Sequence, residues 1–155
     1  MTNTTYSRFL LWVIIAAVIA IVDQLTKWSI IEWIPLYDKV PLNSFIILTH
    51  QTNACAAFIF LADAGGWQRW ILTGISAVVS AGLLIWLWRI PKNDKLLGLA
   101  LAVILGGALG NFIDRLLLGH VIDFISVYVG DWRFATFNIA DSAISVGAVL
   151  LVRSE

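Results

Sequence analysis

Long stretches of apolar residues, separated by short polar segments, dominate the chain. They run over about residues 9–31, 70–88, 96–118 and 137–152, and the last is the shortest. A helix that crosses a bilayer needs about 20 mostly apolar residues, whereas a soluble helix keeps its apolar residues to one face. The pattern therefore predicts an all-α integral membrane protein with four transmembrane helices.

The first apolar stretch has two interpretations. Arg8 precedes an apolar run and Ala20 is a small residue, which is the pattern of a cleaved signal peptide. However, the apolar pattern continues beyond Asp23 and Lys27 as far as Ile34, past the usual length of a signal peptide. We therefore expect a retained transmembrane helix.

Two longer connections, about residues 32–69 and 119–135, lie on one side of the membrane if the four helices alternate. The first contains a β-like run at 44–49 and a turn at 63–66, which predict a small extramembrane strand element. No internal repeat is visible in the sequence, so we expect a single domain over residues 1–155.

Basic residues indicate the orientation of the helices. The connection from Arg89 to Lys95 carries three of them, and Arg8 and Arg153 fall on the same side of the membrane. Because cytoplasmic loops are enriched in Lys and Arg, we expect both termini to be cytoplasmic. Tryptophans lie near the predicted helix ends, as is typical of membrane interfaces: Trp28, Trp33, Trp67, Trp70, Trp86, Trp88 and Trp132.

Composition supports the membrane class and excludes several functions. Hydrophobic residues make up 60% of the chain and charged residues 13%, against about 25% charged in a soluble domain. The formal net charge is zero, so no nucleic acid partner is expected. The single cysteine, Cys55, excludes an internal disulfide and a thiolate-rich metal site.

Four aspartates, Asp23, Asp114, Asp123 and Asp141, lie in or beside the apolar segments. A carboxylate at a helix centre in lipid costs about 2.5–3.5 kcal/mol or more, so intramembrane aspartates usually have a function. At a rise of about 1.5 Å per residue, all four fall near the outer side of the membrane. We therefore expect them to share one layer.

The neighbours of these aspartates form polar stripes at helical spacing, which in lipid turn toward other helices or water. The members are Gly107, Gly110, Asn111 and Asp114 in one segment, and Asn138, Asp141, Ser142 and Ser145 in another. Structural roles are the alternative: helix packing, a helix cap, or ion pairs. The pairs concerned are Gly106 with Gly110, Asn138 with Asp141, Asp23 with Lys27, and Asp114 with Arg115.

Paired carboxylates are the strongest chemistry in the chain. The sequence has no H-E-x-x-H helix, and His50 and His120 are isolated, so local hydrogen bonds are expected for them and no metal or cofactor is predicted. Two aspartates in a partly dry site share one proton; the ionised one activates water and the protonated one donates to a peptide carbonyl. We expect Asp123 and Asp141 to form this dyad.

Two other classes of protein use intramembrane aspartates. A proton-coupled small transporter would spread its acidic residues through the depth of the membrane, whereas those of this chain cluster on one side. An assembly factor would use its aspartates only to lock helices together.

Five motifs run in order over nearly the whole chain: Val22–Lys27, Asn53 with Ala56–Phe58, Gly110–Arg115, Val121–Phe124 and Phe137–Ser142. Together they resemble those of the bacterial lipoprotein signal peptidases, also called type II signal peptidases. The resemblance implies an intramembrane aspartic endopeptidase of the bacterial inner membrane. Such an enzyme removes the signal peptide from prolipoproteins, cleaving just before a diacylglyceryl-modified cysteine.

The resemblance also implies a role for each matched residue. It assigns Asp123 and Asp141 to catalysis, Asn53, Asn111, Arg115 and Asn138 to substrate binding, and Asp23, Lys27 and Asp114 to support of the site. The extramembrane strand would belong to a β-cradle, and the segment between the third and fourth helices would be an outer lid. The active site would lie near the periplasmic face of a monomer, in contact with membrane lipids, where globomycin-type cyclic peptide inhibitors would compete with substrate.

Two positions depart from the family pattern. Cys55 stands where glycine is usual; if that position needs a positive φ, a side chain costs about 1 kcal/mol or more. Thr52 stands where an aromatic residue is common. Loop geometry near Asn53 is therefore the part of the pattern least fixed by the resemblance.

Overall fold

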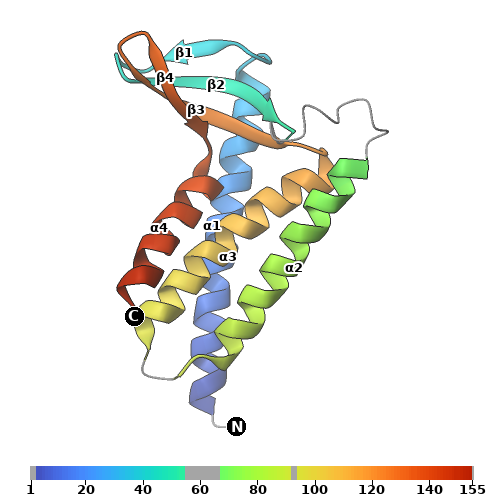
Figure 1. Ribbon diagram of the computed structural model, residues 1–155, viewed down its shortest axis with the longest axis vertical. Helices are drawn as coiled ribbons and strands as arrows, with labels where there is room; N and C mark the ends of the chain where they lie inside the picture. Colours follow the sequence, from blue (N-terminus) through green and yellow to red (C-terminus); the bar gives the residue numbers. More distant parts are fainter. Residues whose placement is uncertain (1–2, 55–66, 92–93, 155) are drawn as a thin grey trace.

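The computed structural model describes residues 3–54, 67–91 and 94–154, and shows a helical bundle with a small sheet across one end (Figure 1). Cys55, the motif residues Ala56–Phe58 and the turn predicted at 63–66 lie outside the described residues. The helices are α1 (Asn3–Trp33), α2 (Trp67–Arg89), α3 (Lys95–Leu117) and α4 (Ile139–Arg153), and the strands are β1 (Lys39–Pro41), β2 (Ile46–Asn53), β3 (Val121–Val129) and β4 (Trp132–Phe137).

Three of the helices are long and apolar enough to cross a membrane. These spans are Tyr6–Trp33, Trp67–Arg89 and Lys95–Leu117. The helix α4 has 15 residues, which corresponds to about 22 Å, so four spanning helices are not confirmed. The fourth helix was expected from residue 137, but Phe137 ends strand β4 and Asn138 is the N-cap, so the helix begins at Ile139.

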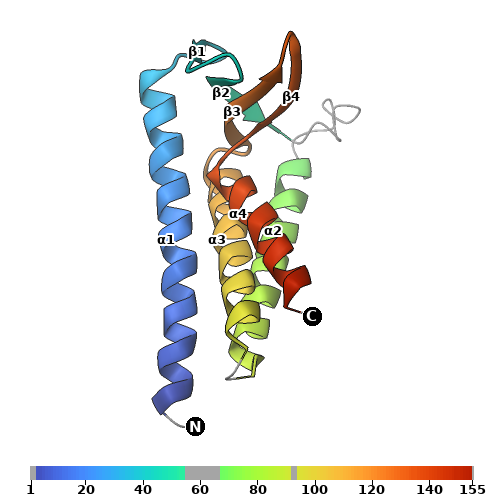
Figure 2. The ribbon, with the colours of Figure 1, turned by 90° about the vertical axis from the view of Figure 1, so that its left-hand side faces the viewer.

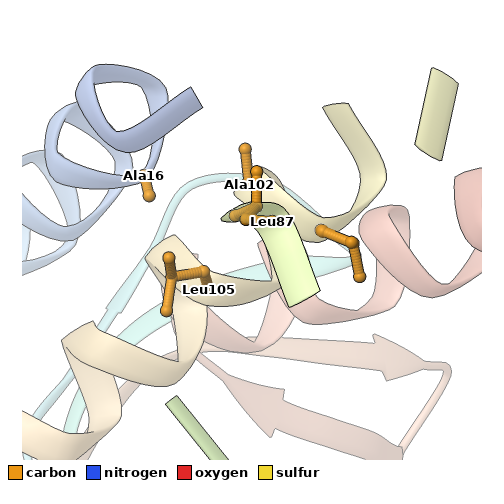
Figure 3. Packing of buried hydrophobic residues seen from close by; sticks show 5 residues of the cluster. Ala16, Leu87, Ala102 and Leu105 are labelled. Carbon is orange, nitrogen blue, oxygen red and sulfur yellow. The ribbon is translucent and has the colours of Figure 1, made fainter. Parts of the chain in front are cut away.

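The helix α3 lies at the centre of the bundle, in contact with α1, α2 and α4, and Figure 2 shows α1 standing along one side. Gly106 allows the close approach of α1, because a Cβ at this position would lie 2.7 Å from Ile19 Cβ and 2.8 Å from the Ala16 carbonyl oxygen. The packing role predicted for the Gly106–Gly110 pair is therefore confirmed. The core of the bundle (Figure 3) consists of Ala16, Leu87, Leu101, Ala102 and Leu105.

The four strands form one antiparallel sheet in the order β1-β2-β3-β4. The strand expected at 44–49 is confirmed as part of β2, whereas β1 was not expected. The second connection was expected as a separate lid, but it forms β3 and β4 of the same sheet. The sequence did not predict these strands because the first six residues of β3 are buried or half-buried without alternation. The two-residue period that marks a half-buried strand is therefore missing from its sequence.

The sheet is fixed to the end of α1 by an apolar cluster. Ile30 of α1 and Ile34, the residue after its last turn, pack against Ile122 and Phe124 of β3. Asp123, between the last two, therefore lies at a position set by the packing of its neighbours on α1.

Candidate active site

A network of polar side chains, most of them buried, joins the helices to the sheet at the sheet end of the bundle. Its residues come from every helix and strand except α2, β1 and β4: Asp23, Gln24 and Lys27 of α1, Asn53 of β2, Asn111 and Asp114 of α3, Asp123 of β3, Asp141 of α4, and Asn138, the N-cap of α4. The structure thus brings together every predicted site residue except Arg115.

Lys27 is the centre of the charged part of the network. Its ammonium nitrogen lies 2.7 Å from Asp23 Oδ2 and 2.8 Å from Asp114 Oδ2, and it donates to Asn111 Oδ1 at 3.1 Å. Because an ammonium group has three hydrogens, these acceptors satisfy it completely. Only 1% of Lys27 is exposed, so this is a buried ion pair of one cation with two carboxylates.

The predicted pair of Asp23 with Lys27 is confirmed, but the pair of Asp114 with Arg115 is wrong. Successive residues of a helix point in different directions, and Asp114 turns to Lys27 instead. Arg115 donates through Nη1 to Ser76 Oγ of α2 at 3.2 Å and to the Asn111 carbonyl at 3.4 Å.

The two carboxylates of this ion pair also fix the elements that carry the candidate dyad. Asp23 Oδ1 accepts from the backbone N–H of Ala140, in the first turn of α4, at 2.8 Å. Asp114 Oδ2 accepts from the backbone N–H of Ile122, beside Asp123, at 3.1 Å. Gln24 donates to Asp114 Oδ1 at 2.7 Å. Sequence reasoning missed Gln24, because its role depends on a partner 90 residues away.

Asn111 connects Lys27 to Asp141 through its side-chain amide. An ammonium group can only donate hydrogen bonds, so the oxygen of the Asn111 amide must face it. The amide nitrogen then faces the other way and donates to Asp141 Oδ1 at 2.8 Å.

Asn138 links the two aspartates of the predicted dyad. Its Oδ1 accepts from the backbone N–H of Asp141 at 2.9 Å, and Asp141 Oδ2 accepts from the backbone N–H of Asn138 at 3.3 Å. This reciprocal pair is a capping box at the start of α4. The Nδ2 group of Asn138 donates to Asp123 Oδ1 at 2.8 Å and to the Ile122 carbonyl at 3.1 Å. The side chain of Asn138 therefore both caps α4 and contacts the dyad.

Asp123 is buried on β3, with 5% of its surface exposed. Its Oδ2 accepts from Asn53 Nδ2 at 3.0 Å. Burial raises the pKa of Asp123 to about 6, and the charge of Asp141 raises this pKa as well, while the hydrogen bonds from Asn53 and Asn138 lower it. The pKa of this carboxyl is therefore well above that of an ordinary aspartate, and Asp123 stays partly protonated at mildly acidic pH.

Neutral amides, not cations, hold both carboxylates of the pair. Within residues 3–54, 67–91 and 94–154, no Lys, Arg or His forms an ion pair with Asp123 or Asp141. A direct cation would fix a carboxylate in its ionised form, whereas these amides orient it and leave it able to accept a proton. The arrangement suits general acid and base chemistry.

No hydrogen bond or ion pair within the described residues joins His50 or His120 to this pair. His50 Nδ1 makes a local hydrogen bond with the Ile34 carbonyl at 2.9 Å, as expected from the sequence. His120 follows α3, and burial lowers its pKa.

Solved membrane enzymes share this fold. One bacterial membrane enzyme, determined by the in meso method, matches with a TM-score of 0.80 and 31% identity over 92% of this chain and 90% of that chain. A second has a TM-score of 0.73 and 32% identity over 92% and 85%. The fold and its buried site define a multi-pass membrane enzyme.

Sequence comparison identifies the family. A family model described as signal peptidase (SPase) II matches residues 15–154. A lipoprotein signal peptidase of Acinetobacter baylyi is 47% identical over 147 residues, which are 95% of this chain and 82% of that protein. One of Escherichia coli O157:H7 is 47% identical over 152 residues, 98% of this chain and 93% of that protein. The chain belongs to the signal peptidase II family and is a peptidase, as its motifs predicted.

Family membership and the structure both bear on whether the first helix is retained or cleaved. The helix α1 supplies Asp23 and Lys27 to the site, and the family match includes most of it. A cleaved segment cannot hold these positions, so both findings favour a retained helix over a signal peptide.

Proposed function

We propose that this protein is an aspartic endopeptidase that removes signal peptides from prolipoproteins, cleaving just before a diacylglyceryl-modified cysteine. The relatives named lipoprotein signal peptidase support the substrate class. The observation that carries the mechanism is that Asn138 contacts both Asp123 and Asp141, which are held only by neutral donors within the described part of the chain.

Asp123 and Asp141 act as a coupled pair that holds one proton. Burial raises the pKa of Asp123, so Asp123 is the member that keeps the proton. Asp141, ionised, takes a proton from a water molecule as the water oxygen attacks the scissile carbonyl carbon. Asp123 gives its proton to the carbonyl oxygen, which forms a neutral tetrahedral intermediate.

Collapse of the intermediate completes the reaction. The bond from carbon to nitrogen breaks, and Asp141 returns its newly acquired proton to the leaving amine of the cysteine. Asp123 takes back a proton from the hydroxyl of the intermediate, so a carboxylic acid is released and the pair regains its starting state. No cofactor enters these steps.

The remaining predicted site residues have supporting roles in this proposal. Asn53 and Asn138 orient Asp123, Asn111 orients Asp141, and Arg115 binds substrate from the side of α2. Asp23, Lys27 and Asp114 fix α4 and β3 against α1. Globomycin-type cyclic peptides compete for the same site.

The proposed setting is the bacterial inner membrane, with the sheet and the site at the periplasmic face and both termini cytoplasmic. Both chain ends lie at the end of the bundle away from the sheet (Figure 1). The helix α4 acts as the fourth span, shorter than the others, and local thinning of the bilayer accommodates it. A single chain supplies every residue of the site, so the enzyme works as a monomer.

This position favours a lipid-modified substrate. The pair lies where the apolar helices end and the sheet begins, so a substrate with acyl chains reaches it sideways from the bilayer while water reaches it from outside. The rival proposal of a transporter requires acidic residues at several depths, and the four aspartates all belong to the one network.

Cleavage of a matched pair of substrates tests the proposal. Purified protein in lipid nanodiscs is given a prolipoprotein with a diacylglyceryl cysteine, or the same chain with its cysteine unmodified. We expect cleavage of the modified chain alone, with mass spectrometry locating the cut just before the cysteine. Equal cleavage of both substrates, or a cut elsewhere, contradicts the proposed specificity, and no cleavage of either by folded protein contradicts the proposed activity.

A further inference from the structure

A cavity of about 260 Å³ lies at the end of the bundle away from the sheet. It is bounded by the first turns of α1, the last turns of α2 and the start of α3. Its walls are apolar side chains such as Phe9, Trp12 and Leu87, and Arg8 and Lys95 also line it. The cavity shares no residue with the candidate active site.

The aromatic walls of this cavity are fixed by packing. The ring of Trp12 lies against the backbone of α3, where a Cβ at Gly98 would be 2.5 Å from Trp12 Cε2. Trp88 makes edge contacts with Phe9 and Tyr6, with ring centroids 4.8 Å and 5.5 Å apart. A ligand therefore meets a cavity that is already formed, which is typical of binding sites.

The charges at the cavity are available for an anion. Arg8 and Lys95 are exposed, and within residues 3–54, 67–91 and 94–154 neither makes an ion pair or a side-chain hydrogen bond. Asp94 also lines the cavity, but its carboxylate accepts from the backbone N–H of Leu97 at 3.1 Å as the N-cap of α3. Two cations thus outnumber the one carboxylate that lines the cavity, and within the described part of the chain neither cation forms an ion pair.

A second cavity continues along the same seam between α1 and α2. It has about 380 Å³ and is lined by small or apolar residues that include Val13, Ala17, Ala81 and Leu84. Val13 directly follows Trp12, and Leu84 precedes Leu87 by three residues, which is about 4.5 Å along a helix. The seam therefore changes from basic and aromatic at its end to mostly apolar further into the bundle, where Ser80 is the one polar side chain among the described residues that line the second cavity.

We propose that the two cavities together bind one anionic phospholipid, with its phosphate between Arg8 and Lys95 and an acyl chain along the α1–α2 seam. Basic pockets between membrane helices on the cytoplasmic side bind acidic head groups, and the seam supplies the matching apolar part. A free phosphate would not use the second cavity. The basic start of a signal peptide would be repelled by the same two cations.

Lipid binding to the full chain tests this proposal without any substrate. Native mass spectrometry of the detergent-solubilised protein measures binding of phosphatidylglycerol, with phosphatidylcholine and inorganic phosphate as comparison ligands. The double variant Arg8→Gln/Lys95→Gln removes both cations of the cavity. The matched control, Arg89→Gln/Arg153→Gln, removes two exposed cations at the same end that do not line it.

We expect the cavity variant to bind phosphatidylglycerol about 30-fold more weakly, the effect of two basic residues at an anionic lipid, and the control to bind like the parent. Filling the seam with Ala17→Leu/Ala81→Leu should weaken binding of phosphatidylglycerol without removing a charge. Equal losses in the cavity and control variants would mean that only bulk charge matters. Competition by inorganic phosphate at comparable concentration would mean a free anion site, and either result overturns the proposal.

Discussion

Asn138 allows the two roles of one site residue to be separated by substitution. Its side chain is fully buried, its oxygen caps α4 and its nitrogen donates to Asp123. Asn138→Ala removes both functions. Asn138→Ser keeps a good capping oxygen, but its hydroxyl ends one bond short of the amide nitrogen, so it loses the contact with Asp123.

The expected losses of stability follow from these contacts. Loss of a capping side chain costs about 1 kcal/mol, and loss of a hydrogen bond to a charged group costs about 1.5–3 kcal/mol. Asn138→Ala should therefore lower the free energy of unfolding by about 2.5–4 kcal/mol, and Asn138→Ser by about 1 kcal/mol less. Unfolding in mixed micelles with increasing SDS, followed by circular dichroism, measures both values.

Activity should respond differently from stability. The hydrogen bond from Asn138 lowers the pKa of Asp123, which burial raises to about 6. Both variants lack this bond, so Asp123 should keep its proton to higher pH, and the alkaline limb of the pH profile of kcat/KM should move upward. Serine at 138 should restore the cap but not the profile. A serine variant with the parent's activity and profile would refute a role of Asn138 at Asp123.

Three further variants, one of them with a matched control, test other parts of the site. Lys27→Met should lower the free energy of unfolding by about 3–5 kcal/mol, because two buried carboxylates lose their cation; unchanged SDS unfolding would contradict this. Gly110→Ala places a Cβ 2.5 Å from a carboxylate oxygen of α1 and should cost about 1–3 kcal/mol, whereas Gly82→Ala, with nothing within 4 Å, should be neutral or stabilising in the same assay. Asn53→Ala removes a bond that lowers the pKa of Asp123, so the alkaline limb should move to higher pH; a downward shift would contradict the assignment.

The sequence predicted the layer in which the site lies, because depth along a helix follows from residue number. Asp23, Asp114 and Asp141 were placed near one side of the membrane, and the structure joins all three in one network. Partners within that network were harder to predict. Asp114 pairs with Lys27, 87 residues earlier in the chain, and not with its neighbour Arg115, because such a contact depends on the packing of α1 on α3.

The hydrophobic pattern of the sequence also did not predict the full extent of the sheet. Most of β3 is buried or half-buried, so its residues lack the alternation that marks a half-buried strand. The start of α4 was placed slightly too early, because Phe137 is apolar but belongs to β4 and not to the helix. Where a strand leads directly into a capped helix, hydrophobicity alone does not show the boundary.

The central claim is that Asp123 and Asp141 share one proton and activate water. The most direct measurement is kcat/KM for a diacylglyceryl-modified prolipoprotein with Asp123→Asn and with Asp141→Asn, each confirmed as folded by its thermal unfolding. We predict that each variant loses about 10²–10⁴-fold or more, the usual contribution of a general acid or base. Cleavage at the parent's rate by either folded variant would contradict the claim.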